Sequence, residues 1–206
     1  DLEDYFLDTT CLKANVHFPV DWVLLRDATR TLLKAVTLIR REGLKARMEA
    51  PEAFMRRMNR FSIQMTQSRR QSRGYRERKR VLRGMKRFVK VIGRHARRHR
   101  DLLDRQWEQT TWTRRQAEQV LGRIDQVLAL LPRAQKQAHE RIIGGRPVNN
   151  AEKILSLYEP DLHVVVRGKA GAEVEFGNTV LLGENRQGLI LDYRKRAQWG
   201  QIHTYY

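Results

Sequence analysis

The 206-residue sequence has little of three features that would each point to a class of protein. It contains one cysteine, Cys11, which excludes an internal disulfide framework and a cysteine-rich zinc site. Cys11 itself is typical of a small core residue on a strand. No apolar run reaches the ~18 residues that a membrane span needs, and no signal peptide is visible. We therefore expect a cytoplasmic protein that is not inserted in a membrane.

Acidic residues are almost missing from residues 69–100. This segment has 15 Lys and Arg against one acid, Glu77, and holds most of the net charge of +18. Solvated helix faces usually mix Lys with Glu, so the bias in sign favours contact with a polyanion. Nucleic acid is the first partner to consider, ahead of an ordinary solvated face and of an anionic membrane surface.

The candidate DNA contacts come from this basic segment and from one later turn. Arginine dominates, and its planar guanidinium suits phosphate oxygens. No base-reading motif occurs, so we expect a grip on the backbone rather than sequence readout. Phosphate contact and ordinary solvation both stay open for the turn residues. The predicted contacts are Arg69, Arg70, Arg73, Arg76, Arg80, Arg83, Arg87, Arg94, Arg97, Arg98 and, in a predicted hairpin turn, Arg167 and Lys169.

The chain divides into strand-like ends and a helical middle. Residues 1–20 have the pattern of a strand, a turn and a second short strand, and residues 21–143 are helical almost throughout. Residues 144–151 form a linker, and residues 152–206 return to strand patterning. Two strands alone are only marginally stable. The economical interpretation is an α+β fold whose single mixed sheet is interrupted by a large, basic, all-helical insertion.

Four helices are expected in the middle zone. Asp21 is a plausible N-cap for the first, and Gly43 follows its end. The third has coiled-coil-like spacing, and with the fourth it predicts an antiparallel helical hairpin. We interpret the apolar stripes of all four as core. The predicted spans are about 21–41, from 51 onward, from 75 past 100, and 113–131.

One carboxylate, Asp8, stands at the end of a strand-like apolar run. Such a residue caps a helix, forms a turn or binds a metal ion, and the structural roles are the commoner ones. Phosphoryl-transfer nucleases nevertheless place an Asp on a central strand, where two further carboxylates complete a site for two divalent ions. Hard oxygen ligands of this kind suit Mg²⁺.

Two segments resemble bacterial insertion-sequence DDE transposases. The first, residues 6–32, has the family's strand end Asp8-Thr9-Thr10, followed by Asn15-Val16-His17-Phe18-Pro19-Val20-Asp21 and Leu24-Leu25. The second, residues 153–194, follows the family pattern at Ser156, Glu159-Pro160, Arg167-Gly168-Lys169, Glu175-Phe176-Gly177 and Gly188-Leu189-Ile190-Leu191-Asp192.

The resemblance implies an RNase H-like domain that cuts and joins DNA at insertion-sequence ends with Mg²⁺. Asp8 is then the first catalytic carboxylate and a metal ligand. The family's second Asp and final Glu have no match, so the expectation is a truncated transposase, inactive alone and associated with the nucleoid. Its partners would be DNA and either a second copy or an intact transposase, with no small-molecule cofactor.

Two other interpretations stay open. The chain is alternatively a non-enzymatic nucleic-acid-binding protein built on the basic helical hairpin, or a defective remnant that inhibits an intact transposase. Glu175 either pairs with Lys169 or assists Asp8. His95 and His99 have zinc-ligand spacing on a helix, but the surrounding arginines repel a cation, so no metal is expected there.

Overall fold

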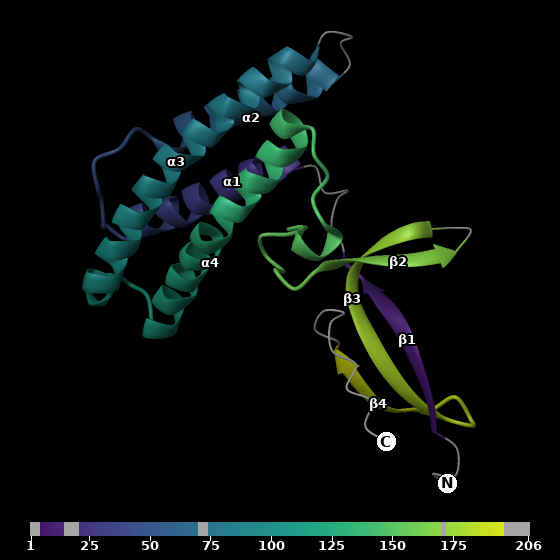
Figure 1. The fold of residues 1–206 in the computed structure, drawn as a ribbon. Helices are drawn as coiled ribbons and strands as arrows, with labels where there is room; N and C mark the ends of the chain where they lie inside the picture. The colour runs from purple at the N-terminus through teal and green to yellow at the C-terminus, as the bar shows by residue number, and fades with distance from the viewer. Residues whose placement is uncertain (1–4, 15–20, 70–73, 170–171, 196–206) are drawn as a thin grey trace. The chain divides into compact units, whose positions relative to one another are not determined.

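The computed structural model describes residues 5–14, 21–69, 74–169 and 172–195. The chain forms two compact units. Residues 19–148 make up the helical unit, and residues 1–18 with 149–206 make up the sheet unit (Figure 1). The predicted α+β class is confirmed, with four α-helices and a four-stranded sheet in the described residues.

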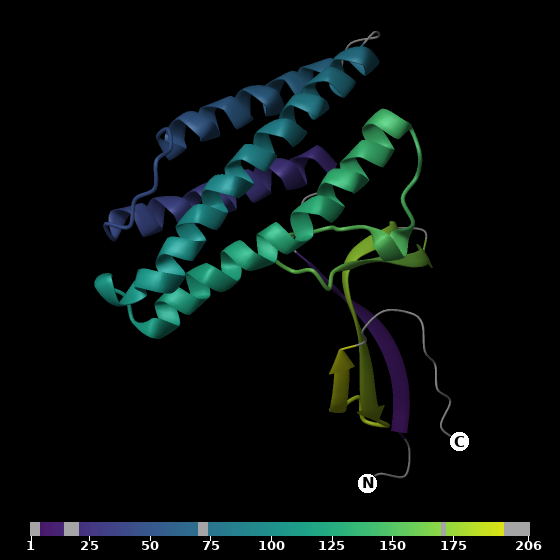
Figure 2. The same ribbon diagram turned by 60° about the vertical axis from the view of Figure 1, so that its left-hand side comes forward.

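The helical unit is organised around its first helix. α1 (Asp21–Arg41) contacts α2 (Pro51–Arg69), α3 (Gly74–Gln106) and α4 (Arg114–Ala138). α3 and α4 run side by side as a hairpin through a short 3₁₀ turn, Trp107–Gln109 (Figure 2). The apolar stripe predicted for α1 is buried throughout, because a helix with neighbours on several sides needs a broad apolar face. Its buried members include Leu25, Leu32, Val36 and Ile39.

α4 continues beyond its predicted end. The sequence predicted an end at about Leu131, yet α4 reaches Ala138 and passes into a π-helical turn, His139–Gly144. Pro132 removes one helical hydrogen bond. Ala134 and Ala138 beyond it are fully buried, and this packing offsets the loss.

Asp21 holds two helices together. It is the first residue of α1, and its buried carboxylate accepts hydrogen bonds from Gln137 Nε2 at 3.0 Å and Arg141 Nη1 at 3.1 Å. The role predicted for Asp21 was a cap on its own helix. Its hydrogen-bond partners lie instead at the end of α4 and in the π-turn, 116 and 120 residues along the chain.

The sheet unit is built on one long strand. β3 (Ala172–Asn185) pairs with β1 (Tyr5–Lys13), β2 (His163–Lys169) and β4 (Ile190–Lys195). All three pairings are antiparallel, so the predicted mixed sheet is wrong for the described strands. The pairing directions follow from connectivity: β2, β3 and β4 succeed one another through short turns, which join antiparallel neighbours.

β2 and β4 share one edge of β3, and β1 has the other. Gly177 pairs with both Lys13 and His163, and Leu182 pairs with both Asp8 and Tyr193. A strand has two edges, so β1 lies opposite β2 and β4. Glycine is required at 177, because a Cβ there would overlap the Leu12 carbonyl oxygen. Among the described strands, β1 pairs with β3 alone.

Candidate nucleic-acid interface

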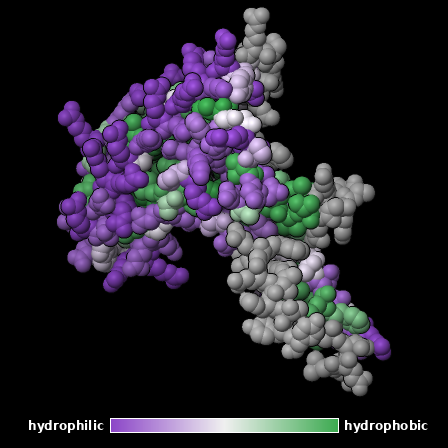
Figure 3. All heavy atoms as spheres, in the orientation of Figure 1, coloured by the Kyte–Doolittle hydropathy of each residue, from purple (hydrophilic) through white to green (hydrophobic). Residues whose placement is uncertain are grey.

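The net positive charge of the chain comes from the helical unit. That unit holds 33 Lys and Arg against 12 Asp and Glu, a net of +21, whereas the sheet unit holds 8 against 11. Hydrophilic side chains cover most of the helical face seen in Figure 3. Positive side chains in this excess repel one another and attract polyanions.

Most of the predicted DNA contacts lie on α3, and their side chains reach solvent. Arg80 is already neutralised, because its Nη2 lies 2.7 Å from Glu77 Oε1. Arg69 ends α2. Arg70 and Arg73 lie outside the described residues. The exposed residues of α3 from the predicted set are Arg76, Arg80, Arg83, Arg87, Arg94, Arg97 and Arg98.

Arg167 and Lys169 are not in a turn. Both lie in β2, and the ladder has an irregularity between Val166 and Lys169. β2 and β3 form the predicted hairpin, but placing Arg167 and Lys169 in its turn was wrong, because β2 extends past Gly168 to pair Lys169 with Ala172.

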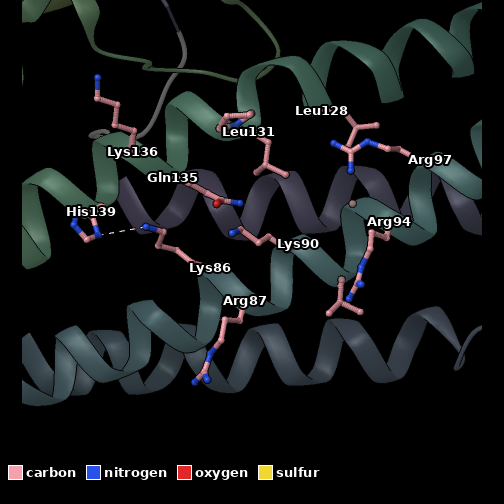
Figure 4. Close-up of a pocket in the computed structure, with 13 residues that line it drawn as sticks. Lys86, Arg87, Lys90, Arg94, Arg97, Leu128, Leu131, Gln135, Lys136 and His139 are labelled. Atoms are coloured by element: carbon pink, nitrogen blue, oxygen red, sulfur yellow. Dashed lines mark hydrogen bonds between the residues drawn. The ribbon is translucent and has the colours of Figure 1, made fainter.

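The structure adds a feature that the sequence did not predict, a groove of about 1000 Å³ between α3 and α4 (Figure 4). α3 supplies five cations to it, at helical spacings of one, three and four residues. α4 supplies a lysine and an amide, and the floor is apolar. The cations are Lys86, Arg87, Lys90, Arg94, Arg97 and Lys136; Val91, Leu128, Leu131 and Pro132 are apolar, and Gln135 and His139 complete the polar lining.

Two residues mark the contact between α3 and α4 beside the groove. A Cβ on Gly93 of α3 would lie 3.5 Å from Leu128 Cδ2 of α4, so the two helices are in contact at this point. Four residues further along α4, Pro132 lines the groove and has no N–H to donate to the Leu128 carbonyl oxygen.

The positive charge in the groove is not compensated. No acid lines it, and within the described part of the chain none of its six cations lies in an ion pair. Arg100, just beyond the groove, differs: it contacts Asp104 at 2.8 Å and Asp125 at 3.1 Å. Unpaired cations at short spacing repel one another, so the groove gains stability from an anion.

Lys86 responds both to burial and to its charged neighbours. Partial burial lowers the pKa of its ammonium, the Lys90 charge lowers it further, and Glu140 opposes both effects. Its Nζ lies 3.3 Å from His139 Nδ1, the contact dashed in Figure 4. A lysine with a depressed pKa in a cleft is the usual mark of a binding site.

Asp8 occupies a different position from the one predicted. It lies in the middle of β1, because Thr9 to Lys13 continue the pairing with β3, and not at the end of a strand. Its exposed carboxylate accepts a hydrogen bond from the Thr9 N–H at 2.7 Å. Phe6 and Thr10 share its face of β1, since strand side chains alternate.

The other acids of the sheet are not gathered around Asp8. Glu175 lies 3.0 Å from Lys13 Nζ, and not beside Asp8. Asp192 pairs with Gly183, one position along from the partner of Asp8, so the two carboxylates are on opposite faces. Within the described ranges there is no group of three or more His, Cys, Asp or Glu that would hold a metal ion.

His99 is a structural residue of the helical core. It is fully buried, its Nδ1 lies 2.8 Å from the His95 carbonyl oxygen, and its Nε2 lies 3.4 Å from the Ala46 N–H and 3.5 Å from Arg40 Nη1. Because Nδ1 donates to the carbonyl, Nε2 accepts, and neither nitrogen is left to bind a metal.

Comparisons of the chain with family models, curated proteins and solved structures gave no significant match. In the part of the chain that the structure covers, no helix has the length and apolar character for a membrane span.

Proposed function

We propose that the chain is the DNA-binding part of a DDE transposase, gripping the phosphate backbone with its helical unit. The observation that carries this proposal is the row of unpaired cations on α3. Arginine forks and lysine ammonium groups along one helix match phosphate oxygens along a backbone. With no acid among them, binding of a polyanion relieves their repulsion.

The catalytic half of the proposal depends on the sheet unit. An antiparallel sheet with an Asp on β1 is compatible with the start of an RNase H-like core. Asp8 offers one exposed, hard oxygen ligand for Mg²⁺, which would supply charge neutralisation at the phosphoryl group. Glu175 and Asp192 are directed elsewhere, so one ligand is present among the described residues. We propose that the chain does not join DNA ends alone and acts with a second copy or with an intact transposase.

A DNA titration tests the proposed contact between the helical unit and the phosphate backbone. Fluorescence anisotropy with a 20-bp duplex should give an affinity that falls steeply with salt, by ~10³–10⁵-fold between 50 and 200 mM if 6–10 phosphates are contacted. Arg94→Gln should weaken binding. Arg114→Gln should weaken it much less, because Arg114 is paired with Glu118 at 2.9 Å. Affinity independent of salt would contradict the proposal.

Asp8 is tested separately, by Mg²⁺-dependent nicking of supercoiled plasmid. We expect no nicking by this chain. Robust nicking that disappears in Asp8→Ala would mean that the remaining ligands are within this chain after all. Titration with Mn²⁺ should broaden NMR signals near Asp8, where a single carboxylate gives weak binding.

The competing function is a nucleic-acid-binding protein without catalysis. One observation favours it: every residue lining the groove belongs to the helical unit, whereas Asp8 belongs to the sheet unit. In that case Mn²⁺ leaves the signals near Asp8 unchanged, while duplex binding and its salt dependence are retained.

A further inference from the structure

We infer that the groove between α3 and α4 holds one unpaired strand of nucleic acid, with phosphates on its cationic walls and bases over its apolar floor. This inference rests on the proposed DNA binding and names the form of DNA that the groove takes. It adds residues of α4, foremost Lys136, to contacts that the sequence predicted in residues 69–98 and at Arg167 and Lys169.

The first argument is the mixed chemistry of the lining. Six cations surround a floor of Val91, Leu128, Leu131 and Pro132. A duplex presents phosphates and sugars outward and keeps its bases stacked inside, so it satisfies the cations and leaves the floor uncovered. A single strand presents phosphates and free base faces together, and it can satisfy both parts of the groove.

The second argument is width. α3 and α4 are packed neighbours, and the axes of packed helices lie about 8–10 Å apart. A duplex is wider than its own major groove, which measures about 12 Å. An intact duplex therefore contacts the outermost cations and does not enter the groove between α3 and α4. From Lys86 to Arg97 the cations extend over ~16 Å of helix, long enough to contact successive phosphates of one strand.

The third argument concerns recognition. No aromatic side chain lines the groove, so the bases are not held by stacking on rings. Gln135 is the only uncharged side chain in the lining that both donates and accepts without titrating. Binding should therefore tolerate any sequence. An acidic amphipathic helix shares part of this chemistry. The groove holds three arginines and three lysines, and the arginine forks suit the oxygens of successive phosphates.

The test compares two matched variants of α4. Lys136→Gln removes a cation from the groove wall, whereas Arg133→Gln removes an exposed cation of the same helix that lies outside the groove. With fluorescein-labelled dT₂₀, Lys136→Gln should reduce the salt slope by about 0.7 and the affinity about fivefold at 0.1 M salt. Arg133→Gln should change both much less, and neither variant should alter binding of a 20-bp duplex.

Lysine footprinting gives a readout that needs no variant. Acetylation followed by mass spectrometry should show Lys86, Lys90 and Lys136 protected by dT₂₀, while exposed Lys34 and Lys45 react as before. If the duplex protects Lys136 equally, or if dT₂₀ leaves it reactive, the inference is overturned and duplex binding by α3 stands. Equal protection by poly-glutamate would assign the groove to an acidic polypeptide. Failure of both dT₂₀ and duplex to bind at 50 mM salt would end the proposed function as well.

Discussion

At the scale of single residues, His99 shows how a polar group is used in this core. Its Nε2 connects α3 to α1 through Arg40 and to the loop after α1 through Ala46, while its Nδ1 bonds the His95 carbonyl oxygen within α3. The sequence placed His99 correctly among the buried residues of α3, because its position follows the helical period. It did not reveal the partners of Nε2, which lie 53 and 59 residues away in the chain.

The buried state of His99 predicts a pH dependence of stability. Burial, the largest cause, lowers the pKa of His99 in the folded chain below the ~6.5 of an unfolded histidine. Below pH ~6.5 the unfolded chain binds a proton that folded His99 does not, so the free energy of unfolding decreases as the pH falls. Urea denaturation should give a lower midpoint at pH 5 than at pH 7.5.

The variant His99→Gln isolates this effect. It keeps a side chain that donates and accepts, and it removes the titration. We expect its midpoint to be lower than that of the wild type at pH 7.5 but to change less between pH 7.5 and 5. His95, whose pKa burial also lowers, keeps some of the dependence in the variant. An unchanged pH dependence would show that His99 is already charged in the folded state.

At the scale of elements, helix spans followed from the sequence more closely than the contacts between them. The periods of α1 and α3 predicted which residues are buried, since one period describes one face. Short turns between β2, β3 and β4 indicate antiparallel neighbours, but no local pattern fixes the direction in which β1 pairs with the distant β3, and the predicted mixed sheet was wrong for that reason. The groove needed α4 as well as α3, and no local signal joins Lys136 to Lys90.

Two glycines in helices give opposite predictions for the same substitution. Gly84 of α3 faces α2, where a Cβ would lie 2.9 Å from Phe61 Cε1, and Phe61 meets Phe88 edge to face with ring centroids 5.9 Å apart. Gly84→Ala should displace that ring and destabilise the helical unit by about 1–3 kcal/mol. Gly122 of α4 is exposed with no atom within 4 Å of its Cβ position, so Gly122→Ala should stabilise by about 0.5–1 kcal/mol.

Chemical denaturation followed by circular dichroism distinguishes the two variants. Their midpoints should move in opposite directions from the wild type, with the slope unchanged. If Gly84→Ala were neutral, α2 would not be packed on α3 through Phe61 as the structure has it.

At the scale of the whole molecule, the net positive charge belongs to the helical unit and not to the sheet unit. The helical unit carries a net +21 and its own core, including the fully buried Leu25, Met58, Ile92 and Ile124. We therefore expect residues 19–148 produced alone to fold and to bind duplex DNA with the salt slope of the full chain. Anisotropy titrations of both proteins in parallel check this. A much smaller slope for the shorter protein would place phosphate contacts in the sheet unit.

The outer side of β1 has a consequence for any chemistry at Asp8. Nine residues of backbone run there without a neighbour among the described strands, and Phe6, Leu7 and Leu12 are at least half exposed across both faces. A further strand paired with this edge of β1 would form backbone hydrogen bonds on either side of Asp8. Asp8 would then lie on an interior strand of the sheet instead of an edge strand. The carboxylate would then be flanked by two backbones, and a ligand on the incoming strand would stand next to it.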